Sequence, residues 1–152
     1  MTSTLDLGIL LGLAYQTFTD ELRADMIMRG FDDLGGAYGY VFRALAVDPL
    51  HLHDLASRLG MTAQGASKII NEMESRGYVE RSPDPEDGRA KLLRLAVRGR
   101  AALAAARRFH AAYERRLRVK LSDHCLNETR RMLEATVASV AADPACAPLR
   151  AF

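Results

Sequence analysis

The sequence predicts a mainly α fold with a small β wing, and two features of its middle third carry this prediction. Residues 51–76 hold two short segments whose apolar side chains recur at helical spacing, joined by a tight turn. Residues 78–97 hold two segments of strand-like composition, separated by a loop rich in proline and charge. Two helices followed by a hairpin predict a winged helix-turn-helix, with further helices at both ends of the chain.

The first of the two helices is predicted over residues 51–59, where Leu52, Leu55 and Leu59 share one side. Gly60 follows, and glycine commonly ends a helix because it adopts the left-handed conformation without a steric penalty. Thr62 is expected to cap the next helix by accepting a hydrogen bond from a free backbone N–H group. These signals place the turn between the helices at residues 60–62.

The second helix, predicted over residues 62–76, has two chemically different faces. Its apolar side chains repeat at helical spacing and pack inward. The outer face carries short hydrogen-bonding side chains and one cation: Gln64, Ser67, Lys68 and Asn71. Side chains of these kinds reach base edges and phosphates when a helix lies in a major groove. An ordinary solvent-facing helix is the alternative for this face taken alone.

The hairpin is predicted to join strands at residues 78–81 and 91–97, although the second segment is also compatible with a helix on periodicity alone. Within the connecting loop, Arg89 carries a guanidinium that suits a narrow minor groove, where the negative potential is strongest. Asp87 suits a salt bridge or a turn cap that fixes the loop. A plain polar hairpin turn is the alternative.

In their order and spacing these segments resemble the MarR-type transcriptional regulators. The matching motifs are Leu-Ala-x-x-Leu-Gly at 55–60, Ser-Lys-Ile-Ile at 67–70, Arg-Gly-Tyr-Val-Glu-Arg at 76–81 and Asp-Pro-Glu-Asp-Gly-Arg-Ala-Lys at 84–91. The resemblance implies a winged helix-turn-helix flanked by N- and C-terminal dimerisation helices. It also implies that Arg89 reaches the minor groove from the wing tip and that Asp87 braces the wing. The predicted DNA-binding residues are therefore Gln64, Ser67, Lys68, Asn71, Arg89 and Lys91.

Two helix starts are unusual for this family. Ala96 and Val97 stand where the family has a threonine, so the helix after the wing is expected to begin shifted or frayed, without a side-chain cap. Ser122 is predicted to cap the last helix, although Cys125 replaces the glutamate of a capping box.

Both ends of the chain carry more apolar surface than one helix partner needs. In the first helix this surface comprises Ile9, Leu10, Leu13, Ala14 and Phe18. In the last helix it comprises Cys125, Leu126, Thr129, Met132, Leu133, Thr136, Val137 and Val140. These stripes predict a homodimer, with a monomeric core as the alternative. We divide the chain into an N-terminal dimerisation region (1–33), a winged helix-turn-helix DNA-binding domain (34–98) and a C-terminal long helix with a dimerisation helix (99–152).

A twofold dimer also predicts the form of the DNA site. It presents two recognition helices about one helical turn apart, ~34 Å, and so predicts a pseudo-palindromic operator. The resemblance implies a repressor released by a small, aromatic or phenolic effector. Candidate effector-binding residues are Tyr15, Phe18, Tyr38 and Tyr40, with plain core packing as the alternative for each.

Composition narrows the class of protein. The 152 residues are 49% hydrophobic, enough for one compact unit, while a net charge of +2 is too small to identify a nucleic-acid binder. No phosphate loop, catalytic triad or metal-hydrolase spacing occurs, so we expect no enzyme, no catalytic residue and no cofactor. Without a membrane-spanning run or a signal-peptide pattern, we expect a cytoplasmic protein with no membrane partner.

Three alternatives stay open. A zinc-responsive regulator would draw ligands from His51, His53, His110, His124 and Cys125, although the expected metal set is none because nothing in the sequence brings them together. A redox-responsive regulator would use Cys125, expected to be buried, or Cys146, expected to be exposed. A winged-helix module that binds a protein partner instead of DNA is the third.

Overall fold

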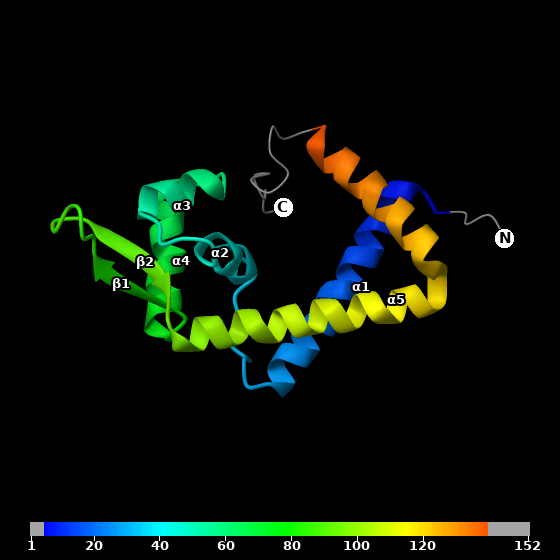
Figure 1. Ribbon diagram of the computed structural model, residues 1–152, viewed down its shortest axis with the longest axis horizontal. Helices are drawn as coiled ribbons and strands as arrows, with labels where there is room; N and C mark the ends of the chain where they lie inside the picture. The colour runs from blue at the N-terminus through cyan, green and yellow to red at the C-terminus, as the bar shows by residue number, and fades with distance from the viewer. Residues whose placement is uncertain (1–4, 140–152) are drawn as a thin grey trace.

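The computed structural model describes residues 5–139 and confirms the predicted fold class. Its elements are α1 (Leu7–Met28), α2 (Tyr38–Leu45), α3 (Leu52–Arg58), α4 (Ala63–Ser75), β1 (Val79–Pro83), β2 (Lys91–Leu95) and α5 (Val97–Ala138). Figure 1 shows α3, α4 and the hairpin at one end of the molecule, with α5 extending from them past α1. Within the described residues, no helix is both long and apolar enough to span a bilayer.

The local signals of the helix-turn-helix are confirmed. Gly60 follows α3 with a φ of 62°, and Gly77 follows α4 with a φ of 75°. The Thr62 side chain caps α4, because its hydroxyl oxygen accepts a hydrogen bond from the Gly65 N–H group at 3.1 Å. With its caps Thr62 and Arg76, α4 spans the predicted segment.

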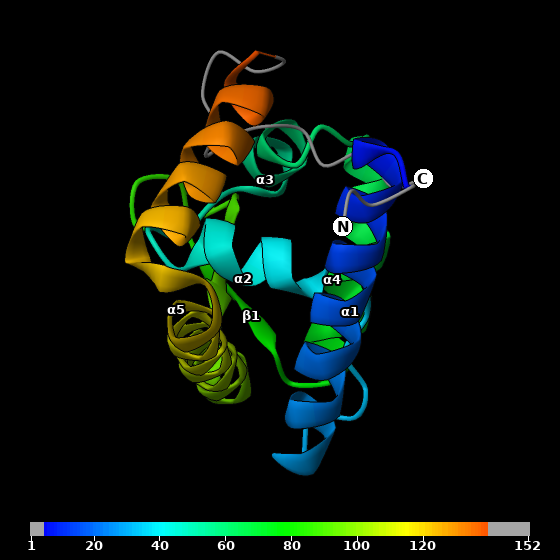
Figure 2. The same cartoon turned by 90° about the vertical axis from the view of Figure 1, so that its right-hand side faces the viewer.

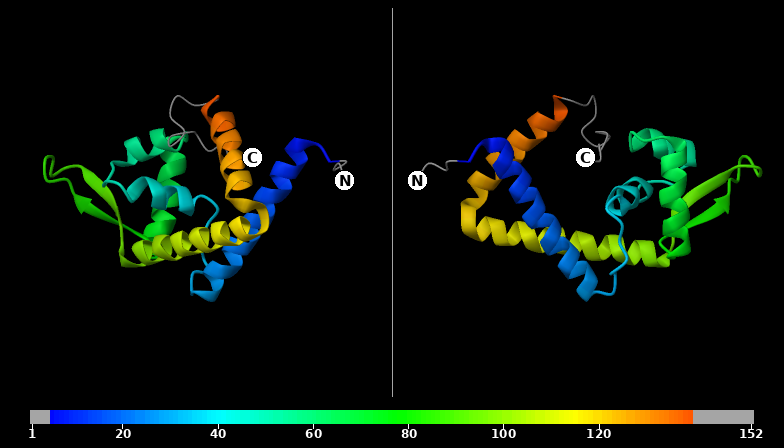
Figure 3. Two further views of the ribbon diagram at one scale, coloured as in Figure 1. Left: turned by 45° about the vertical axis from the view of Figure 1, so that its right-hand side comes forward. Right: turned by 180° about the vertical axis from the view of Figure 1, so that it is seen from behind.

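The wing is an antiparallel pair in which Val79 lies opposite Leu95 and Arg81 opposite Leu93. Leu50 adds a short bridge, since the Leu93 N–H donates to the Leu50 carbonyl at 2.8 Å and the Leu50 N–H donates back at 3.2 Å. Because β2 is a strand, the helical alternative for this segment is wrong. Figure 3 shows the hairpin projecting beyond the helices.

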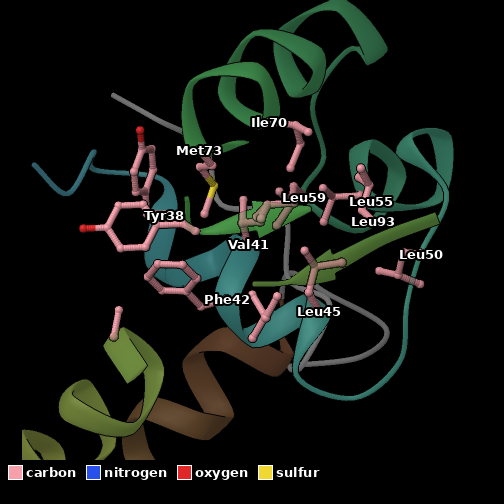
Figure 4. Close-up of a cluster of buried hydrophobic side chains, with 14 of the residues drawn as sticks. Tyr38, Val41, Phe42, Leu45, Leu50, Leu55, Leu59, Ile70, Met73 and Leu93 are labelled. Carbon is pink, nitrogen blue, oxygen red and sulfur yellow. The ribbon is translucent and has the colours of Figure 1, made fainter. Parts of the chain in front are cut away.

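The hydrophobic core lies where α2, α3 and α4 meet the inner face of the wing. Figure 4 shows side chains from all of these elements converging: Tyr38, Val41, Phe42, Leu45, Leu50, Leu55, Leu59, Ile70, Met73 and Leu93. Tyr78 is fully buried beside them, with its ring centroid 5.7 Å from that of Tyr38 and 5.6 Å from that of Phe42. The core therefore belongs mainly to the winged module.

Helix α2 was not predicted from the sequence. This helix has only eight residues, follows Gly35 and Gly36 and contains Gly39, so its periodic signal is short and interrupted. Its residues Val41 and Phe42 are almost completely buried. Tertiary packing rather than local propensity therefore stabilises α2.

Helix α5 begins at Val97 directly after the wing, without a side-chain cap, so the expected shift of its start is not observed. It is broken at Ser122, whose φ is 70°. As predicted, Ser122 caps the last helix, since its hydroxyl oxygen accepts a hydrogen bond from the Cys125 N–H at 3.4 Å. The Arg130–Glu114 ion pair, at 2.7 Å, joins the two arms of α5 across this break.

Helix α1 contacts α5 through an aromatic cluster. The Phe18 ring lies 5.8 Å from Phe109, 5.2 Å from His110 and 5.1 Å from Tyr113, measured between centroids. Beyond this contact, α1 and the last arm of α5 diverge, as Figure 2 shows. Their apolar side chains are consequently exposed on the single chain.

The last arm of α5 corrects one expectation. Cys125 is exposed rather than buried, because Leu126 is the only residue of this arm, within the described part, that is buried. The apolar stripe of the arm has little to pack against within the chain.

At Gly99, in the first turn of α5, any side chain is predicted to lower the stability of the fold. A Cβ atom added there would lie 2.0 Å from the Tyr78 carbonyl oxygen, so the backbone would have to shift. We expect Gly99→Ala to lower the free energy of unfolding by about 1–3 kcal/mol or more, measured by urea denaturation.

The matched control is Gly39→Ala in α2, where an added Cβ meets no heavy atom within 4 Å. This variant should be unchanged or more stable by up to about 1 kcal/mol, because alanine favours the helix. A Gly99→Ala protein as stable as the wild type would contradict the proposed close contact.

Candidate nucleic-acid interface

The outer face of α4 presents the predicted contact residues to solvent. Gln64, Lys68 and Asn71 are exposed, and Ser67 is half-buried. The face is positioned by the opposite side of the helix, where Ile70 and Met73 are fully buried in the core. Within residues 5–139, the side chains of Gln64 and Lys68 form no hydrogen bond or ion pair. Their donors are therefore available to an external partner.

The wing tip is shaped by aspartate side chains that bind the backbone. Asp84 accepts a hydrogen bond from the Glu86 N–H at 2.9 Å, and Asp87 accepts one from the Arg89 N–H at 3.0 Å. Asp87 therefore acts as a turn cap on this loop rather than as an ion-pair partner of the Arg89 guanidinium. In the described part of the chain, the exposed side chains of Arg89 and Lys91 form no ion pair.

The loop end of the wing is tied to His51, the residue before α3. The Nε2 atom of His51 lies 3.0 Å from Asp84 Oδ2, and its Nδ1 atom lies 3.2 Å from the Lys91 carbonyl oxygen. One ring thus contacts the residue that follows β1 and the first residue of β2. His51 is consequently a structural residue of the wing, a role that the sequence analysis did not assign.

A second link joins the wing to α4. The Arg81 guanidinium extends from β1, where its Nη2 atom donates a hydrogen bond to Asn71 Oδ1 at 2.8 Å and its Nη1 atom forms an ion pair with Glu74. Arg81 was not among the site residues predicted from the sequence. The sequence does contain one indication of its role. Arg81 is two residues after Val79 in β1, so this charged side chain lies on the same face of the strand as a buried valine.

A polar junction holds the end of α4, the starts of β1 and α5 and the linker between α1 and α2. The Arg98 guanidinium donates two hydrogen bonds to Asp33, each 3.0 Å long, and a third to the Arg76 carbonyl at 2.7 Å. The Tyr78 hydroxyl also donates to Asp33, and Arg98 lies 4.4 Å above the Tyr78 ring. Asp33 and Arg98 are 65 residues apart, so no local pattern in the sequence indicates their pairing.

The junction changes the acidity of its members. Partial burial by itself would raise the pKa of Asp33, but hydrogen bonds from Tyr78 and Arg98 outweigh this effect and hold the pKa below its ordinary value. Burial and the hydrogen bond to Asp33 raise the pKa of the Tyr78 hydroxyl. At neutral pH the junction therefore contains a carboxylate, a guanidinium and a neutral phenol.

The four candidate effector residues line neither of the two cavities found between the described residues. Tyr38 is part of the core, and its hydroxyl accepts a hydrogen bond from Arg76 at 3.0 Å. Phe18 belongs to the α1–α5 aromatic cluster. The hydroxyl groups of Tyr15 and Tyr40 are hydrogen-bonded at 3.4 Å, and partial burial together with this bond raises the pKa of Tyr40 to about 12.

The cavity of about 400 Å³ between α2, β2 and α5 is lined by other residues, mainly Leu45, Val47, Arg94, Arg100, Leu103 and Arg107. The effector site therefore stays a prediction.

The residues considered for metal binding are dispersed. Across residues 5–139, no three His, Cys, Asp or Glu side chains are grouped closely enough to hold a metal ion. His110 packs against Phe18, and partial burial together with the nearby Arg43 charge lowers its pKa. Cys146 and Val140 lie outside the described residues.

The fold and this surface place the chain in the class of winged helix-turn-helix proteins. Residues 32–90 match the sequence model of the MarR family, and this segment contains both helices of the motif and most of the wing. This central segment is therefore similar to the MarR family, the family that its motifs resemble.

A curated relative agrees with this similarity. The exopolysaccharide II synthesis transcriptional activator ExpG of Rhizobium meliloti (strain 1021) is 26% identical over 117 residues. That match covers 77% of this chain and 60% of ExpG, so the chain spans less than two thirds of this relative. ExpG is named as a regulator and not as an enzyme.

Solved structures share the fold over most of their length. The transcriptional repressor CouR, bound to a 23-mer DNA duplex, is 27% identical with a TM-score of 0.68, covering 90% of this chain and 99% of CouR. The reduced form of Escherichia coli MarR is 19% identical with a TM-score of 0.69, covering 90% and 99%. A Staphylococcus aureus MepR mutant bound to an oligodeoxyribonucleotide is 18% identical with a TM-score of 0.62, again covering 90% and 99%. At these identities MarR and MepR show the fold alone.

Replacing Asp33 tests the polar junction. The lowered pKa of Asp33 means that its contribution is fully present above its unfolded value, about 3.9, and is lost as pH falls through the folded value. We expect Asp33→Asn to reduce the free energy of unfolding at neutral pH, and the difference from the wild type to shrink towards about pH 3. Urea denaturation at both pH values measures this.

Asp32→Asn is the control, because Asp32 is exposed and forms no ion pair within the described residues. It should change stability little at either pH. A difference between Asp33→Asn and the wild type that is the same at both pH values would argue against the ionic junction.

Proposed function

We propose that the protein is a sequence-specific, double-stranded DNA-binding transcriptional regulator that acts as a homodimer. One observation carries the proposal: α4 and the wing tip expose unpaired donors on Gln64, Lys68 and Arg89, on a fold in which the surrounding contacts fix both elements. CouR, at 27% identity, has been solved with DNA, which supports the same use of this surface here.

In this proposal each element has a separate task. Helix α4 lies in a major groove, where Gln64, Ser67 and Asn71 contact base edges and Lys68 contacts phosphate. The wing places Arg89 in the adjacent minor groove, with Lys91 on the neighbouring backbone. Residues 34–98 thus carry DNA binding, and a regulator of this kind works beside the chromosome in the cytoplasm.

Exposed apolar surface supports a homodimer formed through residues 1–33 and 99–152. Leu7 is 62%, Ile9 54% and Leu13 48% exposed on α1, while Leu133 and Val137 are each 41% exposed on the last arm of α5. Such a concentration of apolar side chains at the two ends is typical of a subunit interface. A twofold dimer presents two α4 helices to two major grooves and so requires a pseudo-palindromic operator.

We further propose repression relieved by a small, aromatic or phenolic effector. The repressor name of CouR supports the direction of control, while the activator name of ExpG makes that direction an outcome to be measured. An effector acts only through a difference in affinity between DNA-competent and incompetent spacings, and about 1–3 kcal/mol of coupling is ordinary. A reporter assay with added aromatic carboxylates tests both the direction of control and the response to an effector. A reporter signal that is unchanged with every compound would contradict the proposed effector response.

The DNA proposal predicts different outcomes for two kinds of residue. Arg89→Ala should weaken binding to all sequences and lower the steepness of log affinity against log salt concentration by about one unit. The reason is that the protein loses one positive charge close to the DNA phosphates. Gln64→Ala and Asn71→Ala should instead relax base preference, by about 1–3 kcal/mol at one position. Fluorescence anisotropy with DNA from upstream of the gene and with random competitor measures both.

Equal losses on cognate and random DNA for all three variants would count against base readout by α4. If Lys68→Ala and Arg89→Ala leave the cellular activity intact, the winged module serves a protein partner instead.

The dimer proposal predicts that a charge in the exposed stripe separates the subunits. Leu133→Glu should weaken self-association by about tenfold or more, because an unpaired carboxylate would be desolvated at the interface. Sedimentation equilibrium of the full chain measures this. The control is Val47→Glu, since Val47 is 74% exposed in the loop between α2 and α3, far along the chain from both stripes. A wild-type protein that stays monomeric at high micromolar concentration would overturn the dimer.

A further inference from the structure

The Arg81 side chain binds two residues on successive turns of α4. Its Nη2 atom donates to Asn71 Oδ1 at 2.8 Å, and its Nη1 atom pairs with Glu74, three residues further along the helix. The Arg81 side chain is 28% exposed and that of Glu74 is 39% exposed, so the pair is partly shielded from water. Residues three apart are neighbours on a helix surface, which lets one guanidinium reach both.

The chemistry of this contact fixes how the Asn71 amide is turned. A guanidinium has five donors and no acceptor, so the Asn71 atom that faces it must be the carbonyl oxygen. The oxygen and nitrogen of an amide are nearly identical in shape. The orientation of the Asn71 amide therefore follows from its hydrogen bond with Arg81. The Asn71 amide nitrogen forms no hydrogen bond within the described residues, and the side chain is exposed. Asn71 consequently offers two free N–H donors on the outer face of α4.

This orientation restricts what Asn71 can recognise. Reading adenine in the major groove needs the asparagine oxygen to accept from N6 while the nitrogen donates to N7. Here one lone pair of the oxygen accepts a charge-assisted hydrogen bond from Arg81, which is stronger than a bond to a neutral donor and keeps the oxygen turned toward β1. The free N–H groups instead suit a base edge that presents acceptors, and guanine presents two of them, N7 and O6.

We propose that Arg81 is a positioning residue that commits Asn71 to donating hydrogen bonds to guanine in the major groove. The inference rests on the proposed DNA-binding function and adds which base edge Asn71 reads. Arg81 itself has Glu74 as a counter-ion, so its charge is compensated locally and its role is exerted through Asn71.

The test compares base preference among matched variants of the full chain. Selection from a random duplex library gives the wild-type consensus, and anisotropy then measures binding to duplexes in which each base pair is replaced in turn. Arg81→Lys keeps the charge but removes the guanidinium, whose two terminal nitrogens contact Asn71 and Glu74. Asn71→Asp keeps an oxygen for Arg81 but removes both N–H donors. The control is Arg94→Lys, because Arg94 on β2 lies opposite Glu80 and therefore on the other face of the hairpin from Arg81.

We expect one guanine in each half-site at which Arg81→Lys and Asn71→Asp each reduce discrimination by about tenfold, within the range that a good base contact contributes. Replacing that guanine with 7-deazaguanine should weaken wild-type binding and have little effect on Asn71→Asp. Arg94→Lys should keep the wild-type preference. In an Asn71→Ala background, Arg81→Lys should cause no further loss of discrimination.

A purely structural role for Arg81 would lower affinity for every duplex equally and leave the preference unchanged, which would overturn the inference. So would adenine at the position that responds to Asn71, or an effect of Arg81→Lys that persists undiminished in the Asn71→Ala background. A wild-type protein that selects no consensus would overturn the proposed function, and the inference with it.

Discussion

The pairing of Asp33 with Arg98 is the interaction on which the arrangement of the molecule depends. Arg98, one residue into α5, binds the carboxylate of the α1–α2 linker and the carbonyl of Arg76, which caps α4. Tyr78, at the start of the wing, donates to the same carboxylate, and Gly99 lies against the Tyr78 backbone where no side chain fits. Four segments therefore meet at one ion pair. The direction in which α5 leaves the winged module is set here, and with it the spacing that two modules of a dimer would have.

Two further polar links give the module its internal rigidity. His51 fixes both strands of the wing to the start of α3, and Arg81 fixes β1 to the outer edge of α4. Each link connects elements whose inner faces already share the hydrophobic core. Because the core sets the distance between wing and helix while the polar contacts set their orientation, Asn71 and Arg89 are presented in a fixed relation to each other. A surface that is organised before binding loses less conformational freedom when it meets a partner.

The fold was largely predictable because its signals are local. Thr62 and Gly60 define the turn of the helix-turn-helix through their own backbone preferences, and Ser122 marks the start of the last helix in the same way. Helix α2 was not predictable, because its short glycine-containing segment is helical only when Val41 and Phe42 are packed into the core. The exposure of Cys125 was wrongly predicted for a related reason, since an apolar stripe indicates that a surface is to be covered but not what covers it.

The sequence by itself determined the order of the elements other than α2, the polar face of α4 and the residues at the tip of the wing, because spacing, caps and turns depend on near neighbours along the chain. Only the tertiary structure decided that Asp33 binds Arg98, that Arg81 turns the Asn71 amide and that Tyr38 belongs to the core. These contacts join residues brought together by folding, and a sequence carries no local mark of which distant charge or ring its residues will meet.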